Sequence, residues 1–482
     1  MTMQLKDPSL LKSQCLIDGK WVGEGMDAVN NPATGDFIAK VPRFGAAETH
    51  LAIEAAQRAF KPWAQRTAKE RANIMRKWFD LIIANKEDLA TIMTAEQGKP
   101  IAEARGEIDY AASFVEFYAE EAKRIYGETI PSHRADARIL VIRQPIGVMC
   151  AITPWNFPAA MITRKVSPAL AVGCTAVIKP APETPLTALA IGELALRAGI
   201  PAGVLNLVTG DAPAIGEVMC AHDDVRFIGF TGSTEVGRLL MKQASPTIKK
   251  VGLELGGNAP FIVFDDADVD AAVQGAIVSK FRNMGQTCVC ANRIYAQDGI
   301  YDTFVSKLAT EVAKMKVGNG MDVGVTQGPL INAEAIGKVE AHIADAVGQG
   351  ARVVVGGKRH ELGGTFFQPT VLAGATTKML LSREETFGPV APVFRFTQDS
   401  DVVEMANDTE FGLAAYFYAR DLGRVFRVAE ALDYGMVGIN TGLLATEVAP
   451  FGGVKQSGLG REGSRHGVEE FVEMKYLLLA GI

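Results

Sequence analysis

The sequence predicts an α/β protein in which strands and helices alternate in two successive series. Three features indicate this class: a helical N-terminal region, the strand–helix–strand repeats that follow it, and a second set of repeats after the glycine pair Gly256-Gly257. Strand, helix and strand in this order form right-handed crossovers, which make the strands parallel. A chain of 482 residues is long enough for two or three domains.

The first series begins with helices. Apolar residues at a spacing of three to four predict helices over 46–63, 68–93 and 101–126, with breaks at Pro62 and at Gly98-Lys99-Pro100. The elements predicted after them are strands 137–145, 147–153, 174–180, 204–210 and 225–232, helices 185–198 and 234–244, and a short helix after residue 210.

The second series starts after Glu254, so a domain boundary is expected near residue 255. Its predicted elements are strands 259–264, 293–297 and 351–357 and helices 269–283, 301–315 and 333–349. The apolar tail, 476–482, has the composition of a strand. It forms either an edge strand of its own domain or a strand paired with another subunit.

The composition is that of a globular protein with a large core. Apolar residues make up 48% of the chain, and 49 Lys and Arg stand against 55 Asp and Glu, a net charge of −6. A mildly acidic chain without a basic run argues against nucleic acid or an anionic membrane as partner. Residues 1–21 show no leader pattern, no stretch is long enough to span a bilayer, and six scattered cysteines form no disulfide framework. We expect a cytoplasmic protein.

Several common motifs are present only in part. Residues 458–463 match G-x-G-x-x-G, but no strand precedes them and the chain ends before a βαβ unit could close. The nucleophile elbow of hydrolases is absent, and His360-Glu361 lacks a second His four positions on. Cys288 and Cys290 alone supply too few ligands for structural zinc. No metal site is expected.

Two candidate binding sites lie at the ends of predicted strands. Lys179 ends an apolar strand, where a cation could hold ribose hydroxyls or phosphate, although a solvated lysine explains it equally well. Gly232 and Ser233 open a helix whose free N–H groups could bind phosphate, unless Ser233 is only a helix cap.

Three further side chains have catalytic chemistry. Cys288 follows Gly285-Gln286-Thr287, a loop from which a thiol can reach a cleft, although a single cysteine is more often buried and inert. Glu254 ends a strand before two glycines and could act as a base. Asn156 lies in a loop framed by prolines, where its amide could face an oxyanion.

Taken together, the motifs resemble those of the aldehyde dehydrogenase superfamily. The matching segments cover essentially the whole chain in the order typical of that superfamily: PWNFP (154–158), VIKPAPETP (177–185), FTGSTEVG (230–237), LELGGNAP (253–260), FRNMGQTCVCANR (281–293), EETFGPV (384–390) and PFGGVKQSGLGRE (450–462). Within it, AAMITRK (159–165) and KQSGLGREG make the chain similar to members that oxidise succinate semialdehyde, with close relatives acting on glutarate semialdehyde.

The resemblance implies a fold in three parts. A Rossmann-like NAD(P)-binding domain would comprise 1–125 and 145–254, and an α/β catalytic domain 255–446. A small β oligomerisation element would comprise 126–144 and 467–482. The implied assembly is a homotetramer built from dimers.

The resemblance also implies a role for each candidate residue. Cys288 would add to the aldehyde carbon, Asn156 and the Cys288 N–H would hold the oxyanion, and Glu254 would activate water to hydrolyse the thioester left after hydride transfer. The implied cofactor positions are Trp155, Lys179, Pro182, Gly232, Ser233, Glu385 and Phe387. The implied ligands of the substrate's far carboxylate are Arg164, Arg282 and Ser457.

NADP or NAD is the expected cofactor. Many NAD-preferring relatives carry an acid three residues after this lysine, whereas this chain has Pro182 there and Glu183 one position later, which favours NADP. Two other classes are a cysteine hydrolase, which would not need Lys179 and Glu385, and a binding protein, which would not need Cys288. A reversible disulfide between Cys288 and Cys290 is a further hypothesis; the alternative is a buried Cys290 without a role.

Overall fold

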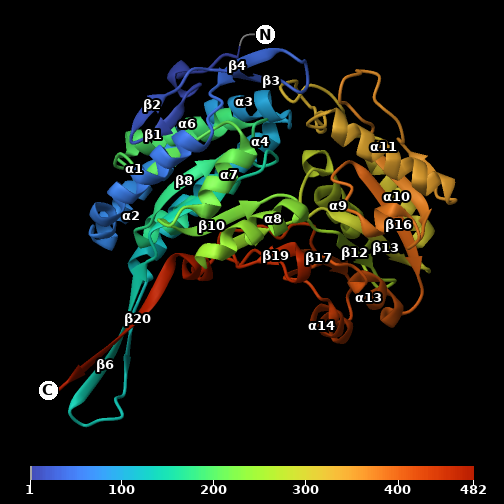
Figure 1. The fold of residues 1–482 in the computed structure, drawn as a ribbon. Helices are drawn as coiled ribbons and strands as arrows, with labels where there is room; N and C mark the ends of the chain where they lie inside the picture. Colours follow the sequence, from blue (N-terminus) through green and yellow to red (C-terminus); the bar gives the residue numbers. More distant parts are fainter. Residues whose placement is uncertain (1–2) are drawn as a thin grey trace.

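The computed structural model describes residues 3–482, whose strands form two large sheets, a projecting three-stranded sheet and a two-stranded sheet. Helices cover the two large sheets, and the three-stranded sheet extends away from the body with the C-terminus at its tip (Figure 1). Within residues 3–482 no helix combines the length and the apolar character that a bilayer crossing needs.

The first large sheet has the strand order β19-β11-β10-β7-β8-β9-β1-β2. Its parallel strands are β7 (Val148–Ile152), β8 (Thr175–Lys179), β9 (Leu205–Leu207), β10 (Val225–Thr231) and β11 (Lys250–Glu254). The strands β1 (Cys15–Ile17), β2 (Lys20–Val22) and β19 (Gly458–Leu459) join antiparallel at the edges. These edge strands were not predicted, because two or three residues are too few to show a period of two.

The helices around this sheet correct two predictions. They are α1 (Ala46–Ala64), α2 (Ala68–Ala84), α3 (Lys86–Gln97), α4 (Ile101–Glu121), α5 (Ala160–Val172), α6 (Pro185–Ala198), α7 (Ala212–Ala221) and α8 (Thr234–Ala244). Helix α1 ends at Ala64, two residues after Pro62 and one residue beyond the predicted end. The single helix predicted over 68–93 is two helices that meet at Asn85, and α4 ends at Glu121 instead of residue 126.

The second large sheet has the order β14-β15-β16-β13-β12-β17-β18. Its strands are β12 (Ala259–Val263), β13 (Ala291–Gln297), β14 (Arg352–Val355), β15 (Thr370–Ala375), β16 (Val390–Phe396), β17 (Ala414–Tyr418) and β18 (Met436–Ile439), and its helices are α9 (Val269–Phe281), α10 (Tyr301–Val312), α11 (Ala333–Gly348), α12 (Leu380–Arg383), α13 (Asp399–Asn407) and α14 (Leu422–Ala431). The chain leaves the first sheet at Glu254 and enters the second at Ala259, close to the predicted boundary. The domain limits themselves stay predictions.

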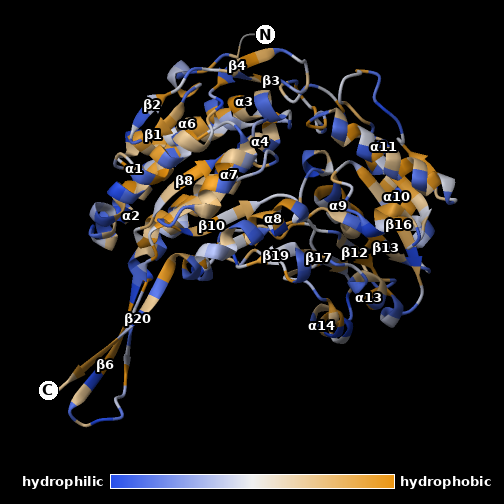
Figure 2. Ribbon diagram, viewed as in Figure 1, coloured by the Kyte–Doolittle hydropathy of each residue, from blue (hydrophilic) through white to orange (hydrophobic). Residues whose placement is uncertain are grey.

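The projecting sheet contains β5 (Glu128–Ile130), β6 (Ala137–Pro145) and β20 (Val472–Ala480). Strand β20 pairs antiparallel with β6 from Val472–Pro145 to Ala480–Ala137, so the apolar tail does pair within its own chain. It is also an edge strand, and Met474 and Tyr476 on it are 70% and 57% exposed. Figure 2 shows apolar residues along both projecting strands. Such a surface is typical of an interface.

The remaining two strands, β3 (Asp27–Asn30) and β4 (Phe37–Val41), form a separate hairpin near the N-terminus. For the candidate site the important element is α5, because every residue from Ala160 to Val172 is buried. Burial of the whole helix fixes the polar side chains that it carries, Arg164 and Lys165 among them.

Candidate active site

Cys288 lies in a tight loop between α9 and β13. It is the one cysteine of the described chain that is partly exposed; the other five are buried. The loop contains three consecutive residues with positive φ, Asn283 at 51°, Met284 at 58° and Gly285 at 74°. A Cβ on Gly285 would stand 2.2 Å from the Gly388 carbonyl oxygen, so only glycine fits there. The backbone therefore holds Cys288 against the segment that contains Glu385 and Phe387.

The environment of Cys288 keeps its thiol protonated in the free protein. Burial raises the pKa of the Cys288 thiol to about 12, and the Arg164 guanidinium opposes this only in part. A nearby base must therefore take the proton when the sulfur reacts. Cys290 is buried, and its N–H donates to the Thr287 carbonyl at 3.0 Å. A disulfide between Cys288 and Cys290 stays a prediction.

Asn156 faces the loop of Cys288 from the segment between β7 and α5. Its Nδ2 donates to the Gln286 carbonyl at 3.1 Å. Because an amide nitrogen carries two hydrogens, one remains for an oxyanion. The main chain is fixed as well, because Lys99 Nζ and Asn283 Nδ2 donate to the Asn156 carbonyl at 2.7 and 3.0 Å.

Lys99 belongs to a buried ion pair that supports this segment. Its Nζ lies 2.5 Å from Glu107 Oε2, and both side chains are 1% exposed. The other Glu107 oxygen accepts the Ala159 N–H at 2.9 Å. The sequence analysis used Gly98-Lys99-Pro100 only as a helix break, because nothing in the chain order connects Lys99 with Asn156.

Glu254 stands at the end of β11 and is 3% exposed. Its Oε2 has no hydrogen-bond partner among residues 3–482. Burial, and then the negative charge of Glu462, raise the pKa of the Glu254 carboxyl well above its usual value, while Arg164 and Lys165 act in the opposite direction. A carboxylate with a raised pKa is suited to accept a proton near neutral pH.

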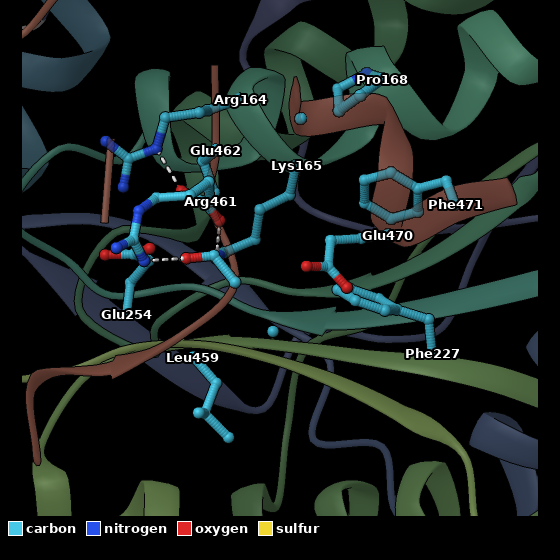
Figure 3. Close-up of a pocket in the computed structure, with 13 residues that line it drawn as sticks. Arg164, Lys165, Pro168, Phe227, Glu254, Leu459, Arg461, Glu462, Glu470 and Phe471 are labelled. Atoms are coloured by element: carbon cyan, nitrogen blue, oxygen red, sulfur yellow. Dashed lines mark hydrogen bonds and ion pairs between the residues drawn. The ribbon is translucent and has the colours of Figure 1, made fainter. Parts of the chain in front are cut away.

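Three cations gather around Glu254 and Glu462 (Figure 3). Arg164 and Lys165 from α5 both form ion pairs with Glu462. Burial alone would raise the pKa of Glu462, but these two cations hold it below its usual value. Together with Arg461, these residues line a cavity of about 20 Å³, which has room for one water molecule. Lys165, Arg461 and Glu462 were not singled out from the sequence.

The two arginines predicted to bind a carboxylate lie in different settings. Arg164 is 1% exposed, and its guanidinium lies 4.2 Å from the centroid of the Phe451 ring. Burial disfavours the charge of Arg164. Glu462, and after it Tyr110, Glu254 and Cys288, nevertheless raise the pKa of Arg164 above its usual value. These four side chains therefore lie in the same region as Arg164. Arg282 is only partly buried, lies 5.0 Å from the Phe157 ring centroid, and borders a small cavity beside Thr287 and Val289.

The Ser457 hydroxyl bonds to the backbone of its own chain, and its role as a carboxylate ligand stays a prediction. Ser457 is wholly buried, its Oγ donates to the Gly256 carbonyl at 2.7 Å, and it accepts the Gly412 N–H at 2.9 Å. Because the Ser457 hydroxyl both donates to and accepts from the backbone, it fixes the position of the glycine pair Gly256-Gly257 after Glu254. The motif KQSG identified the segment but not the direction of this side chain.

Lys179 and the start of α8 fit a dinucleotide. Lys179 is 2% exposed, and in the described chain its Nζ donates to the Pro180 carbonyl at 3.2 Å, which leaves two of three N–H groups for a ligand. Burial lowers the pKa of Lys179.

Ser233 caps α8, because its Oγ accepts the Val236 N–H at 3.3 Å. The Gly232 N–H donates to the Glu254 carbonyl at 3.1 Å. The cap does not exclude a phosphate on the remaining N–H groups. Pro182 lies in the loop before α6.

Glu385 and Phe387 alternate with Glu384 and Thr386 along the loop 384–388, in which Phe387 has a positive φ of 52°. Glu385 accepts the Gly257 N–H at 3.4 Å, and burial raises its pKa to about 7. The Phe387 ring meets Trp155 edge-on, with centroids 5.6 Å apart.

The side chains of Glu384 and Thr386 contact the buried His342 of α11, a residue that was not predicted from the sequence. Its Nδ1 lies 3.1 Å from Thr386 Oγ1 and its Nε2 3.3 Å from Glu384 Oε2.

Comparison with known proteins identifies the family. The profile of the aldehyde dehydrogenase family matches residues 21–477. The chain belongs to the aldehyde dehydrogenase family. A glutarate-semialdehyde dehydrogenase from Pseudomonas aeruginosa is 64% identical over 100% of both chains. An NADP(+) succinate-semialdehyde dehydrogenase from Escherichia coli (strain K12) is 63% identical over 99% of this chain and 100% of the other.

A solved aldehyde dehydrogenase structure has the same fold. The crystal structure of a succinate-semialdehyde dehydrogenase from Burkholderia pseudomallei gives a TM-score of 0.98 at 61% identity and covers 99% of each chain. The predicted α/β class, the family and the assignment as an oxidoreductase are thereby confirmed. The two similar relatives carry different substrate names, so similarity to aldehyde dehydrogenases does not by itself select the substrate.

Proposed function

We propose that this aldehyde dehydrogenase oxidises succinate semialdehyde to succinate with NADP⁺ or NAD⁺, and that the five-carbon glutarate semialdehyde is its alternative substrate. The observation that carries the proposal is the grouping of Arg164 with Cys288 and Glu254, with Arg282 on the same loop as the thiol. Guanidinium groups bind carboxylates through paired, charge-assisted hydrogen bonds. An aldehyde that carries a distant carboxylate would present its carbonyl carbon to Cys288 and its carboxylate to the two arginines.

The first step joins Cys288 to the aldehyde carbon. The sulfur forms the new S–C bond, the carbonyl π electrons move to oxygen, and the thiol proton passes to the Glu254 carboxylate, directly or through water. The Asn156 side chain and the Cys288 N–H stabilise the oxyanion. A bound nicotinamide supplies a hydride acceptor, which leaves the substrate as a thioester on Cys288.

The second step hydrolyses the thioester. After the proton from the first step has passed from Glu254 to solvent, Glu254 takes a proton from water as the water oxygen bonds to the acyl carbon. The carbonyl then re-forms as the S–C bond breaks, and Glu254 gives its proton to the Cys288 sulfur. The residue suits this role because its carboxylate is buried and one oxygen has no partner among residues 3–482. Without Glu254 the acyl group would remain on the enzyme.

The chain's own residues define the proposed cofactor site. Lys179 would hold ribose hydroxyls or phosphate, Gly232 and Ser233 the N–H groups at the start of α8, and Glu385 the nicotinamide ribose. Phe387 and Trp155 would lie beside the nicotinamide ring. Pro182 leaves no carboxylate to repel a 2′-phosphate, which favours NADP.

We also propose the domain limits, the assembly and the location of the protein. The NAD(P)-binding domain comprises 1–125 and 145–254 and the catalytic domain 255–446. The segments 126–144 and 467–482 join subunits in a cytoplasmic homotetramer. The exposed apolar side chains and the open edge of β20 support this arrangement.

The absorbance of newly formed NAD(P)H tests the proposed function. We expect NAD(P)H to form with succinate and glutarate semialdehydes at a kcat/KM well above that for butanal, and Cys288→Ala to abolish both this activity and ester hydrolysis. A cysteine hydrolase would cleave esters without forming NAD(P)H, and a binding protein would do neither. One methylene is worth only about 1–3 kcal/mol, so the two semialdehydes should differ less from each other than from butanal.

A further inference from the structure

Tyr110 lies on the face of α4 that is turned toward the substrate arginines. Glu103, Glu107 and Tyr110 are spaced by four and three residues and so share one face of the helix. Glu103 accepts the Asn283 N–H at 2.8 Å, next to Arg282. Glu107 accepts the Ala159 N–H at 2.9 Å, at the start of the helix that carries Arg164.

The same face continues to the loop of Glu462. Tyr118, two turns after Tyr110, donates its Oη to the Ser464 carbonyl at 3.0 Å. Between them Phe114 meets the Tyr110 ring edge-on, with centroids 4.9 Å apart. Tyr110 is thus enclosed by α5, the loop of Arg282 and the loop of Glu462.

The Tyr110 hydroxyl is buried beside the Arg164 guanidinium, which acts on it as a hydrogen-bond donor, whereas its own hydrogen has no acceptor in the described chain. Buried hydroxyls almost always use their hydrogen, so one left without an acceptor next to a binding site points to a ligand. Burial raises the pKa of Tyr110, although Arg164 and Arg282 both act to lower it. The group therefore stays protonated as a donor in a region of positive charge, which suits an anionic acceptor.

We propose that Tyr110 donates a hydrogen bond to the far carboxylate of the ω-oxo acid substrate, beside Arg164 and Arg282. Tyr110 adds a hydroxyl to the predicted carboxylate ligands Arg164, Arg282 and Ser457. The proposal rests on the proposed function, because it needs a substrate with a distant carboxylate. Tyr110 would then be a specificity-determining residue, since a neutral aldehyde offers its hydroxyl no acceptor.

The test compares Tyr110→Phe with Tyr118→Phe, which removes the same atom from the same helix face. A hydrogen bond to a charged group corresponds to roughly a 10- to 150-fold effect. We expect Tyr110→Phe to lower kcat/KM for the semialdehydes by that factor and to leave butanal within about twofold. Its Tm should fall less than that of Tyr118→Phe, because the Tyr110 hydroxyl makes no bond to the backbone. Tyr118→Phe should lower Tm and leave the substrate ratio unchanged.

The results separate this proposal from the proposed function. A parent enzyme without preference for semialdehydes over butanal would overturn both. A parent with that preference, together with a Tyr110→Phe enzyme whose ratio is unchanged or whose losses are equal on both substrates, would overturn only the role of Tyr110.

Discussion

The Arg164 guanidinium forms a buried ion pair with the Glu462 carboxylate, which connects α5 with the loop after β19. The same carboxylate is paired with Lys165 and raises the pKa of Glu254. One acidic residue therefore controls the charge around both the candidate base and Arg164, one of the two proposed carboxylate ligands. This dependence yields the first prediction.

Glu254→Gln should slow thioester hydrolysis and leave a pre-steady-state burst of NAD(P)H. A base works when deprotonated, so the raised pKa of Glu254 makes deacylation increase as pH rises through that pKa.

Glu462→Gln removes a negative charge, lowers the pKa of Glu254, and should move the acid limb of the kcat profile to lower pH. An unmoved acid limb would contradict the coupling of these two carboxyls; thermal unfolding shows whether the variant is folded.

Lys99→Met should strongly destabilise the protein. It removes the buried partner of Glu107 and the donor at 2.7 Å from the Asn156 carbonyl. Loss of one member of a buried pair costs about 3–5 kcal/mol, whereas an exposed pair contributes about 0–1 kcal/mol. Lys123→Met, which breaks the exposed Lys123–Glu120 pair, is the matched control. Equal shifts of Tm in the two variants would show that the buried pair is not important for stability.

His342→Phe should weaken cofactor binding specifically. Because the Glu384 carboxylate only accepts hydrogen bonds, the His342 Nε2 carries the hydrogen, and Thr386 donates to Nδ1. The imidazole thereby fixes Glu384 and Thr386, the two side chains that alternate with Glu385 and Phe387. We expect the Kd for NAD(P)H, measured by fluorescence, to rise about tenfold. His342→Gln, which keeps one bond, should lie between. Ester hydrolysis without cofactor should stay unchanged; a parallel loss would indicate general damage.

Much of the fold was predictable because its helices and parallel strands are long. Helices 185–198 and 234–244 were predicted with their observed bounds, since their apolar periodicity ends at clear caps. Helix 46–63 was predicted to within one residue of its observed end at Ala64. The division at Asn85 was missed, because the apolar periodicity continues on both sides of Asn85 and its side chain makes no cap hydrogen bond.

The site was only partly predictable, because a motif identifies a segment but not the direction of each side chain. Ser457 stands in a matching motif yet bonds to the backbone at Gly256 and Gly412. Tyr110 and His342 stand in ordinary helical stretches, and only the tertiary structure brings them to Arg164 and to Glu384. Nothing in sequence spacing could have identified them.

The ratio of kcat/KM for succinate semialdehyde to that for butanal, measured in the parent and in Arg282→Gln, tests the central claim most directly. Arg282 is better suited than Arg164, whose removal would leave Glu462 without one of its two buried partners. A charge-assisted hydrogen bond implies that the ratio should fall by roughly 10- to 150-fold, with butanal little changed. Equal losses on both substrates would show that Arg282 is structural and would contradict recognition of a semialdehyde through its carboxylate.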